Sequence, residues 1–123
     1  MFKWLRRKAK NNVPKHIHDC FFRLKEILSD EDLEAIKSME EDKTYMLHFS
    51  LGMTLRNDWG LWEGSELSKY FNKFGIDHPD DMTATIFTTF WRYLNDKPLD
   101  IEGLATKYQE YWKNMKVQYP KSF

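Results

Sequence analysis

Apolar residues recur three or four positions apart along most of this chain, and no segment of useful length alternates apolar and polar residues as a half-buried strand does. A spacing of three to four is the repeat of an amphipathic α-helix, which turns one apolar stripe toward the core. The sequence therefore predicts an all-α fold, a compact bundle of five to six short helices. We expect a basic N-terminal segment (1–12), one helical domain (13–117) and a C-terminal tail (118–123).

Capping residues and prolines predict where the helices begin. Pro14 suits the first position of a helix, because the N–H that proline lacks would have no partner there. Ser29 and Asp100 are good N-caps for two further helices. His78-Pro79 predicts another helix start, with Asp80 and Asp81 over the positive end of the helix dipole.

The helix predicted over residues 44–57 has an unusually wide apolar arc. Met46, Phe49 and Met53 fall on one stripe, and Leu47, Leu51 and Leu55 fall on the adjacent one. An arc of this width predicts contacts on more than one side, so we expect this to be the central helix. Gly52 predicts a close approach by another helix. Asn57 is expected to take the left-handed conformation that ends the helix.

Length and cysteine content limit the class of protein. A chain of 123 residues fits one domain. The single cysteine, Cys20, excludes an internal disulfide and fits a reducing compartment. No apolar run approaches the ~18 residues that a membrane span needs, and the basic N-terminus lacks the apolar core of a signal peptide. We therefore expect a cytoplasmic protein without a membrane span.

Charge is balanced overall but unevenly placed. Residues 1–15 hold six basic and no acidic residues, which fits either a terminal helix packed on the body or an arm for a membrane surface or nucleic acid. Residues 29–42 hold seven acidic residues and one lysine, which fits either a solvated helix face or a docking surface for a basic protein. An acidic body argues against nucleic-acid binding through it. The acidic residues are Asp30, Glu31, Asp32, Glu34, Glu40, Glu41 and Asp42.

Two polar segments stand out between the predicted helices. The first is Arg56-Asn-Asp-Trp-Gly-Leu-Trp62, where one helix is expected to end, and the second is His78-Pro-Asp-Asp-Met82, where another begins. They resemble the paired motifs of a bacterial and phage-associated family of small helical domains of unknown function, over about residues 45–112. The resemblance implies a small helical module and carries no catalytic activity with it. It marks as signature positions Arg56, Asn57, Trp59, Gly60, Trp62, His78, Asp80 and Asp81.

These signature residues allow a structural and a functional interpretation. In the structural one, Arg56 pairs with Asp80 or Asp81, and Trp59 and Trp62 cover the gap between the helices. In the functional one, an open pocket of Arg56, Asn57, Asp58, Trp59, Trp62 and His78 binds a nucleotide or an anionic metabolite. Catalysis or metal binding by His78 with Asp80 or Asp81 is the weaker alternative, because capping explains these residues. We expect no enzyme, no cofactor and no metal site.

The function that these observations favour is a non-enzymatic protein–protein interaction module. Its most concrete form is an immunity-type inhibitor that neutralises a basic bacterial toxin through the acidic residues between positions 29 and 42. A small-ligand-binding module around the signature residues is the alternative. A homodimer that uses the surplus of aromatic residues as its interface is a third.

Overall fold

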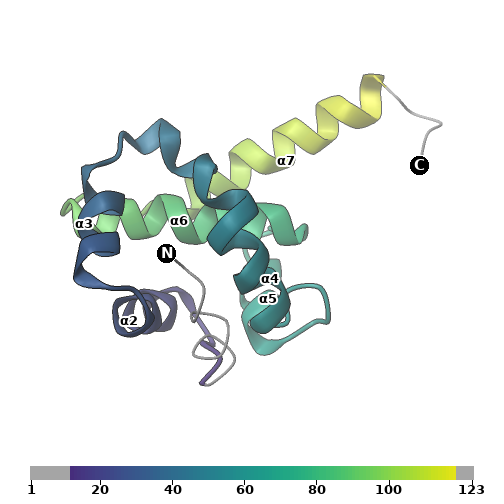
Figure 1. Ribbon diagram of the computed structural model, residues 1–123. Coiled ribbons are helices and arrows are strands. Elements are labelled where there is room, and N and C mark those ends of the chain that lie inside the picture. The colour runs from purple at the N-terminus through teal and green to yellow at the C-terminus, as the bar shows by residue number, and fades with distance from the viewer. Residues whose placement is uncertain (1–11, 119–123) are drawn as a thin grey trace.

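The computed structural model describes residues 12–118, and this part of the chain consists of helices joined by turns and loops, without a strand, which confirms the all-α prediction (Figure 1). The basic segment lies outside the described residues apart from Asn12, and the tail lies outside them apart from Gln118. The domain boundaries therefore stay predictions. The elements in chain order are α2 (Ile17–Ile27), α3 (Asp30–Ser38), η1 (Glu41–Leu47), η2 (His48–Gly52), α4 (Met53–Asp58), α5 (Glu66–Asn72), α6 (Pro79–Leu94) and α7 (Ile101–Gln118).

Helix α6 is the centre of the fold. It packs against α2, α3, α4, α5, α7, η1 and η2, and the ribbon shows it running through the middle of the bundle. Its threonines can be buried because their hydroxyls donate to carbonyls one turn earlier, as Thr85 does to Asp81 (2.7 Å) and Thr89 to Thr85 (2.6 Å). The prediction that residues 44–57 form the central helix is wrong.

The stretch from Glu41 to Asp58 is helical but irregular. It begins as the 3-10 helix η1, widens into the π-helix η2 and ends as the short α-helix α4. Leu47, Leu51 and Leu55 point into the core, whereas the other predicted stripe is exposed. Phe49 and Met53 lie two residues from the nearest of these leucines, which places them on the opposite side of a helix. This is why a wide apolar arc did not mean contacts on both sides.

Several of the predicted caps are present. The side chain of Ser29 accepts a hydrogen bond from the backbone N–H of Asp32, as predicted. At the start of α5 the side chain of Ser65 accepts one from the N–H of Ser68. Asp100 accepts one from the N–H of Gly103 at 3.1 Å. The first helix begins later than predicted, because His16 caps it by accepting from the N–H of Asp19. Pro14 therefore precedes α2 and does not begin it.

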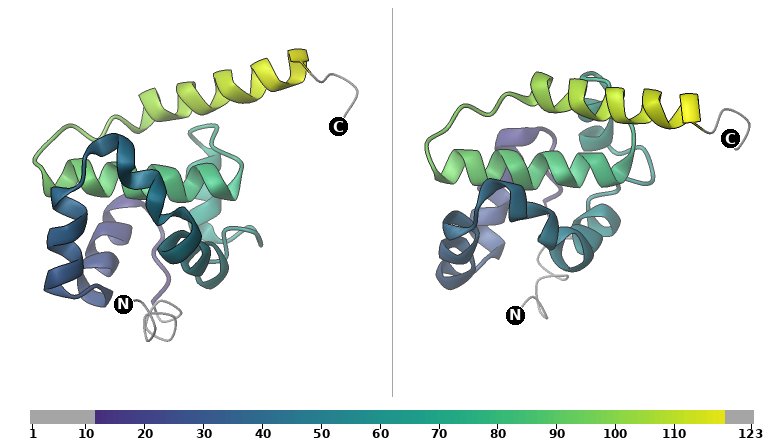
Figure 2. Two further views of the ribbon diagram at one scale, coloured as in Figure 1. Left: turned by 45° about the horizontal axis from the view of Figure 1, so that its top comes forward. Right: turned by 90° about the horizontal axis from the view of Figure 1, so that it is seen from above.

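Helix α7 runs antiparallel to α6 and continues past the N-terminal end of α6. Its first half packs on the body through the buried side chains of Leu104 and Ala105. Its second half passes the start of α6, where the indole N–H of Trp112 donates to Asp81 at 2.7 Å, and its end projects beyond α6 (Figure 2).

Candidate functional site

The bend after α4 is shaped by glycine and not by asparagine. Asn57 and Asp58 are still part of α4, and Gly60 takes the left-handed conformation with φ of 65°. The N–H of Leu61 then donates to the carbonyl of Arg56 at 3.1 Å, which closes the helix end. The prediction that Asn57 adopts the left-handed conformation is therefore wrong.

The start of α6 lies directly against this bend. His78 caps α6, since its Nδ1 accepts a hydrogen bond from the N–H of Asp80 at 3.0 Å. Pro79 follows in the first helical position, as predicted. Asp80 then faces the end of α4, where its Oδ1 lies 3.5 Å from Nε of Arg56. The two motifs therefore contact each other.

Arg56 is buried, and it binds more than the predicted aspartate. Its Nη1 donates to Thr83 Oγ1 at 3.0 Å and lies 3.1 Å from Nδ1 of His48. Because guanidinium has only donors, His48 Nδ1 must be the acceptor in that contact. Nη2 donates to the carbonyl of His48 at 3.1 Å. One side chain thus connects α4, the start of α6 and the π-helical turn η2.

Of the two aspartates considered from the sequence, Asp80 is the one that forms an ion pair with Arg56. The second aspartate is used elsewhere, because Asp81 Oδ2 accepts from the indole N–H of Trp112 at 2.7 Å. Arg56 therefore holds the shape of η2 and α6, and its guanidinium is not open to a ligand.

Gly52 is required by this junction. A Cβ at this position would lie 3.0 Å from Arg56 Nη1, 3.2 Å from the carbonyl oxygen of Leu47 and 3.3 Å from the ring of Phe87 in α6. The close approach of a second helix that the sequence predicted is therefore present.

We expect Gly52→Ala to lower the free energy of unfolding by about 1–2 kcal/mol, because the overpacking outweighs the better helix propensity of alanine. Urea denaturation measures this. Gly64→Ala is the matched control for the added methyl group, because nothing lies within 4 Å of a Cβ there, although its φ of 75° adds backbone strain. A gain in stability for Gly52→Ala would contradict the crowding.

The two tryptophans of the first motif have opposite environments. Trp59 is 0% exposed within the core, whereas Trp62 is 57% exposed. Trp62 begins a row of exposed and half-exposed rings that continues through His78 and Trp112 to Tyr111. His78 stacks on Trp112 with centroids 5.4 Å apart. Of the remaining signature side chains, Asn57 is exposed and Asp58 is half-buried.

A cleft of about 520 Å³ lies between the start of α6 and α7, where His78, Asp81 and Trp112 line it beside Lys113 and Lys116. Burial raises the pKa of the Asp81 carboxyl, and the hydrogen bond from Trp112 partly opposes this. The signature residues that reach this cleft are His78 and Asp81 alone, so the pocket considered from the sequence is not assembled as one site.

Within the described range, neither a membrane-crossing helix nor a metal-binding cluster is found. No helix between residues 12 and 118 combines the length and the apolar character that a bilayer demands. Histidine, cysteine and carboxylate side chains of the same range form no group of three that could hold a metal ion.

The outer side of η1, η2 and α4 carries the most exposed apolar residues of its region. Tyr45 is 67% exposed, Met46 62%, Phe49 80% and Met53 50%. We call these four residues the apolar face. Contiguous exposed apolar surface on a soluble domain is typical of interaction sites, whereas single exposed residues are ordinary. The exposure of this face was not predicted, because residues three or four positions apart are also the pattern of a buried helical stripe.

The seven acidic residues between positions 30 and 42 divide into two groups. Glu41 is half-buried and bound by Arg92 of α6, whose Nη2 and Nε lie 2.8 and 3.2 Å from Oε2. Asp32 is buried at the start of α3. The side chains that remain exposed are those of Asp30, Glu31, Glu34, Glu40 and Asp42.

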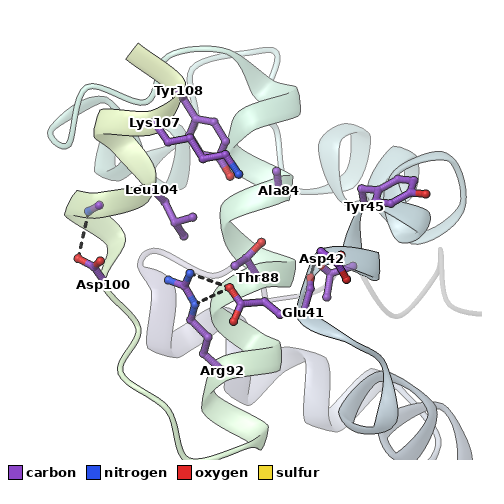
Figure 3. A pocket seen from close by; sticks show the side chains of 12 residues that line it. Glu41, Asp42, Tyr45, Ala84, Thr88, Arg92, Asp100, Leu104, Lys107 and Tyr108 are labelled. Carbon is purple, nitrogen blue, oxygen red and sulfur yellow. Dashed lines mark hydrogen bonds and ion pairs between the residues drawn. The ribbon is translucent and has the colours of Figure 1, made fainter. Parts of the chain in front are cut away.

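A cavity of about 790 Å³ forms a groove between η1 and the first half of α7 (Figure 3). Ala84 and Thr88 of α6 form its floor. Arg92 closes one end, because it binds Glu41 and also donates to the carbonyl of Leu99 at 2.6 Å. This groove was not predicted either. The one available signal was Arg92, the first charged residue after a long uncharged stretch of α6.

The comparison with curated proteins found no match, and the comparison with solved structures found none. A family model described as a domain of unknown function, DUF6794, matches residues 13–94. This range holds both motifs and stops before α7. That the motifs define the family, and that the family is bacterial or phage-associated, stay predictions. With two thirds of its length matched, the chain belongs to the DUF6794 family of domains of unknown function.

Proposed function

We propose that this protein is a non-enzymatic protein–protein interaction module whose apolar face is the centre of the contact. The observation that carries the proposal is the exposure of Tyr45, Met46, Phe49 and Met53 within nine residues of chain. Aromatic residues and methionine are enriched in the centres of protein interfaces. The buried leucines on the opposite side of the same segment hold the face in place.

Charge next to the apolar face points to the kind of partner. Glu40 and Asp42 directly precede the face in the chain, and Asp30, Glu31 and Glu34 are exposed on α3. An apolar centre with a charged rim is the common plan of a specific interface, and complementary charge speeds encounter. The proposed partner is therefore a protein with a basic surface around an apolar patch. In the most concrete form of the proposal, the partner is a basic bacterial toxin that this protein neutralises in the cytoplasm.

The side chains that could act as a nucleophile or a general base support binding better than catalysis. Cys20 is buried, and burial raises the pKa of its thiol, which disfavours the nucleophilic thiolate. Ser65 and Ser68 are engaged in the cap of α5. His48 and His78 are held by Arg56 and by the α6 cap.

We expect Phe49→Asp to abolish capture of the partner in a pull-down from the native host, because it places a charge at the centre of the interface. Phe22→Asp is the matched control: Phe22 is 69% exposed on α2, away from the apolar face. Both variants should keep the helical circular dichroism of the wild type. Equal loss of capture by the two variants, or none by either, would contradict the proposal.

Reversing Glu40 and Asp42 to lysine tests the charged rim separately. We expect a slower association rate with the captured partner and a weaker dependence of that rate on salt, with a smaller effect on dissociation. Surface plasmon resonance at several salt concentrations measures both. If the partner is a toxin, co-expression should restore growth of cells that produce its toxic domain, and the Phe49→Asp variant should not.

The small-ligand alternative is weakened by the burial of Arg56 and Trp59. It is tested by thermal shift against a panel of nucleotides and anionic metabolites. A true ligand at 100 times its dissociation constant should stabilise the protein by about 2.7 kcal/mol. Such a response, lost on substitution of His78, would favour the cleft at the start of α6 over the apolar face.

A further inference from the structure

Methionine side chains in this protein differ widely in their access to water. The chain has six methionines, and five of them lie in the part that the structure describes. Met46 and Met53 are exposed, whereas Met82 is 1% exposed in the core. Met39 and Met115 are half-buried. The two exposed methionines of the described range are therefore both members of the apolar face.

Phe49 lies between these two methionines. It follows Met46 by three residues and precedes Met53 by four, a helical spacing that places the three side chains on one side of the segment. Phe49 is also the most exposed of the four residues of the apolar face. The two thioethers therefore flank the centre of the proposed contact.

An exposed thioether is open to oxidation by a peroxide. The sulfur attacks one peroxide oxygen, so the O–O bond breaks and an S–O bond forms. The thioether loses two electrons and becomes a sulfoxide, while hydrogen peroxide is reduced to water. A flexible apolar side chain thereby becomes a polar one that accepts hydrogen bonds.

The single cysteine does not compete for the oxidant. Cys20 is fully buried, and burial raises the pKa of its thiol, which disfavours the thiolate that reacts with peroxides. Among the described residues, the thioethers of Met46 and Met53 are therefore the sulfur atoms that a peroxide in solution reaches first.

We propose that Met46 and Met53 form a peroxide-sensitive modification site, at which oxidation to the sulfoxide turns the apolar face polar and prevents binding of the partner. The effect on binding rests on the proposed function, whereas the oxidation itself does not. Both side chains lie at the surface, so the sulfoxides leave the core intact. Unpaired polar groups at the centre of the contact raise the dissociation constant of the partner by about tenfold or more. Methionine sulfoxide reductases reverse the modification.

Peptide mapping by mass spectrometry after short exposures to hydrogen peroxide tests the site on the protein alone. We expect Met46 and Met53 to oxidise about tenfold faster than Met82 or more, because susceptibility follows exposure. The helical circular dichroism should stay unchanged at the dose that oxidises these two residues. Equal rates for the exposed and the buried methionines, or loss of helix at that dose, would overturn the proposal.

Hydrophobic-interaction chromatography measures the change of the apolar face, again without a partner. The peroxide-treated wild type should elute earlier than the untreated protein. Met46→Leu/Met53→Leu should keep its elution after the same treatment, because leucine is apolar, similar in size and not oxidised. The matched control Met39→Leu/Met115→Leu should respond to peroxide as the wild type does. An equal shift in the first leucine variant and in the wild type would place the site elsewhere and overturn the proposal.

The pull-down then connects the site with binding. Peroxide-treated wild type should capture about tenfold less partner than the untreated protein, and Met46→Gln/Met53→Gln should show the same loss without peroxide. Treated Met46→Leu/Met53→Leu should capture the partner as the untreated wild type does. Undiminished capture by the treated wild type would overturn the effect on binding. If Phe49→Asp leaves capture unchanged, the proposed contact fails, and the mapping and the chromatography still decide the modification site.

Discussion

Replacing Trp59 with alanine is expected to lower the free energy of unfolding by about 4 kcal/mol, the largest effect of any single substitution discussed for this protein. The indole is fully buried and is the largest of the completely enclosed side chains. Its removal leaves a cavity at the end of α4, where Gly60 fixes the backbone and little collapse is possible. Urea denaturation followed by circular dichroism measures the loss.

Trp62→Ala is the control for this prediction, because it removes the same side chain from the same motif. Trp62 is mostly exposed, so we expect its removal to cost less than about 1 kcal/mol. If Trp59→Ala does not fold, Trp59→Phe supplies the measurement, with a smaller but still clear loss. Similar losses from the two alanine variants would show that burial of Trp59 does not hold the bend.

Replacing Arg56 with alanine is expected to cost about 3 kcal/mol, because it removes one buried guanidinium with several partners. The carbonyl and Nδ1 of His48 lose their contacts with this donor, and Asp80 loses its ion pair. Asp80 is about half exposed, so water replaces part of that ion pair and most of the loss comes from the buried hydrogen bonds.

Arg56→Lys distinguishes charge from geometry. Lysine keeps the positive charge near Asp80 but cannot reach Thr83 and both acceptors of His48 with one planar group. We therefore expect Arg56→Lys to lose most of what Arg56→Ala loses, again by urea denaturation. If lysine restores near wild-type stability, the ion pair with Asp80 is the main interaction and the shape of η2 does not depend on the guanidinium.

Arg56 also links the signature to the proposed contact. It binds the carbonyl of His48, which begins the π-helical turn, and Phe49 follows at the most exposed position of the apolar face. π-Helical turns are rare and often occur at functional sites. In this interpretation the buried signature residues support a surface on the opposite side of the same segment.

The sequence by itself determined the helical class and most helix starts. These features depend on local spacing and capping chemistry: Ser29, Ser65, His78 and Asp100 act on backbone groups within three residues of themselves. A helix cap of this kind can be predicted from the sequence because the capping side chain and the backbone N–H that it accepts from lie in the same short segment. The contact between the two motifs was one of two interpretations that the sequence left open, because Arg56 and Asp80 are distant in the chain.

Only the tertiary structure decided which apolar stripe is buried. Met46, Phe49 and Met53 recur at helical spacing, as Leu47, Leu51 and Leu55 do, and burial of one row depends on where α6 lies. The tertiary structure also decided that Glu41 is bound by Arg92, 51 positions away, while Asp42 stays exposed. Local periodicity predicts neither the buried row nor the pairing of Glu41, because each depends on a residue distant in the chain.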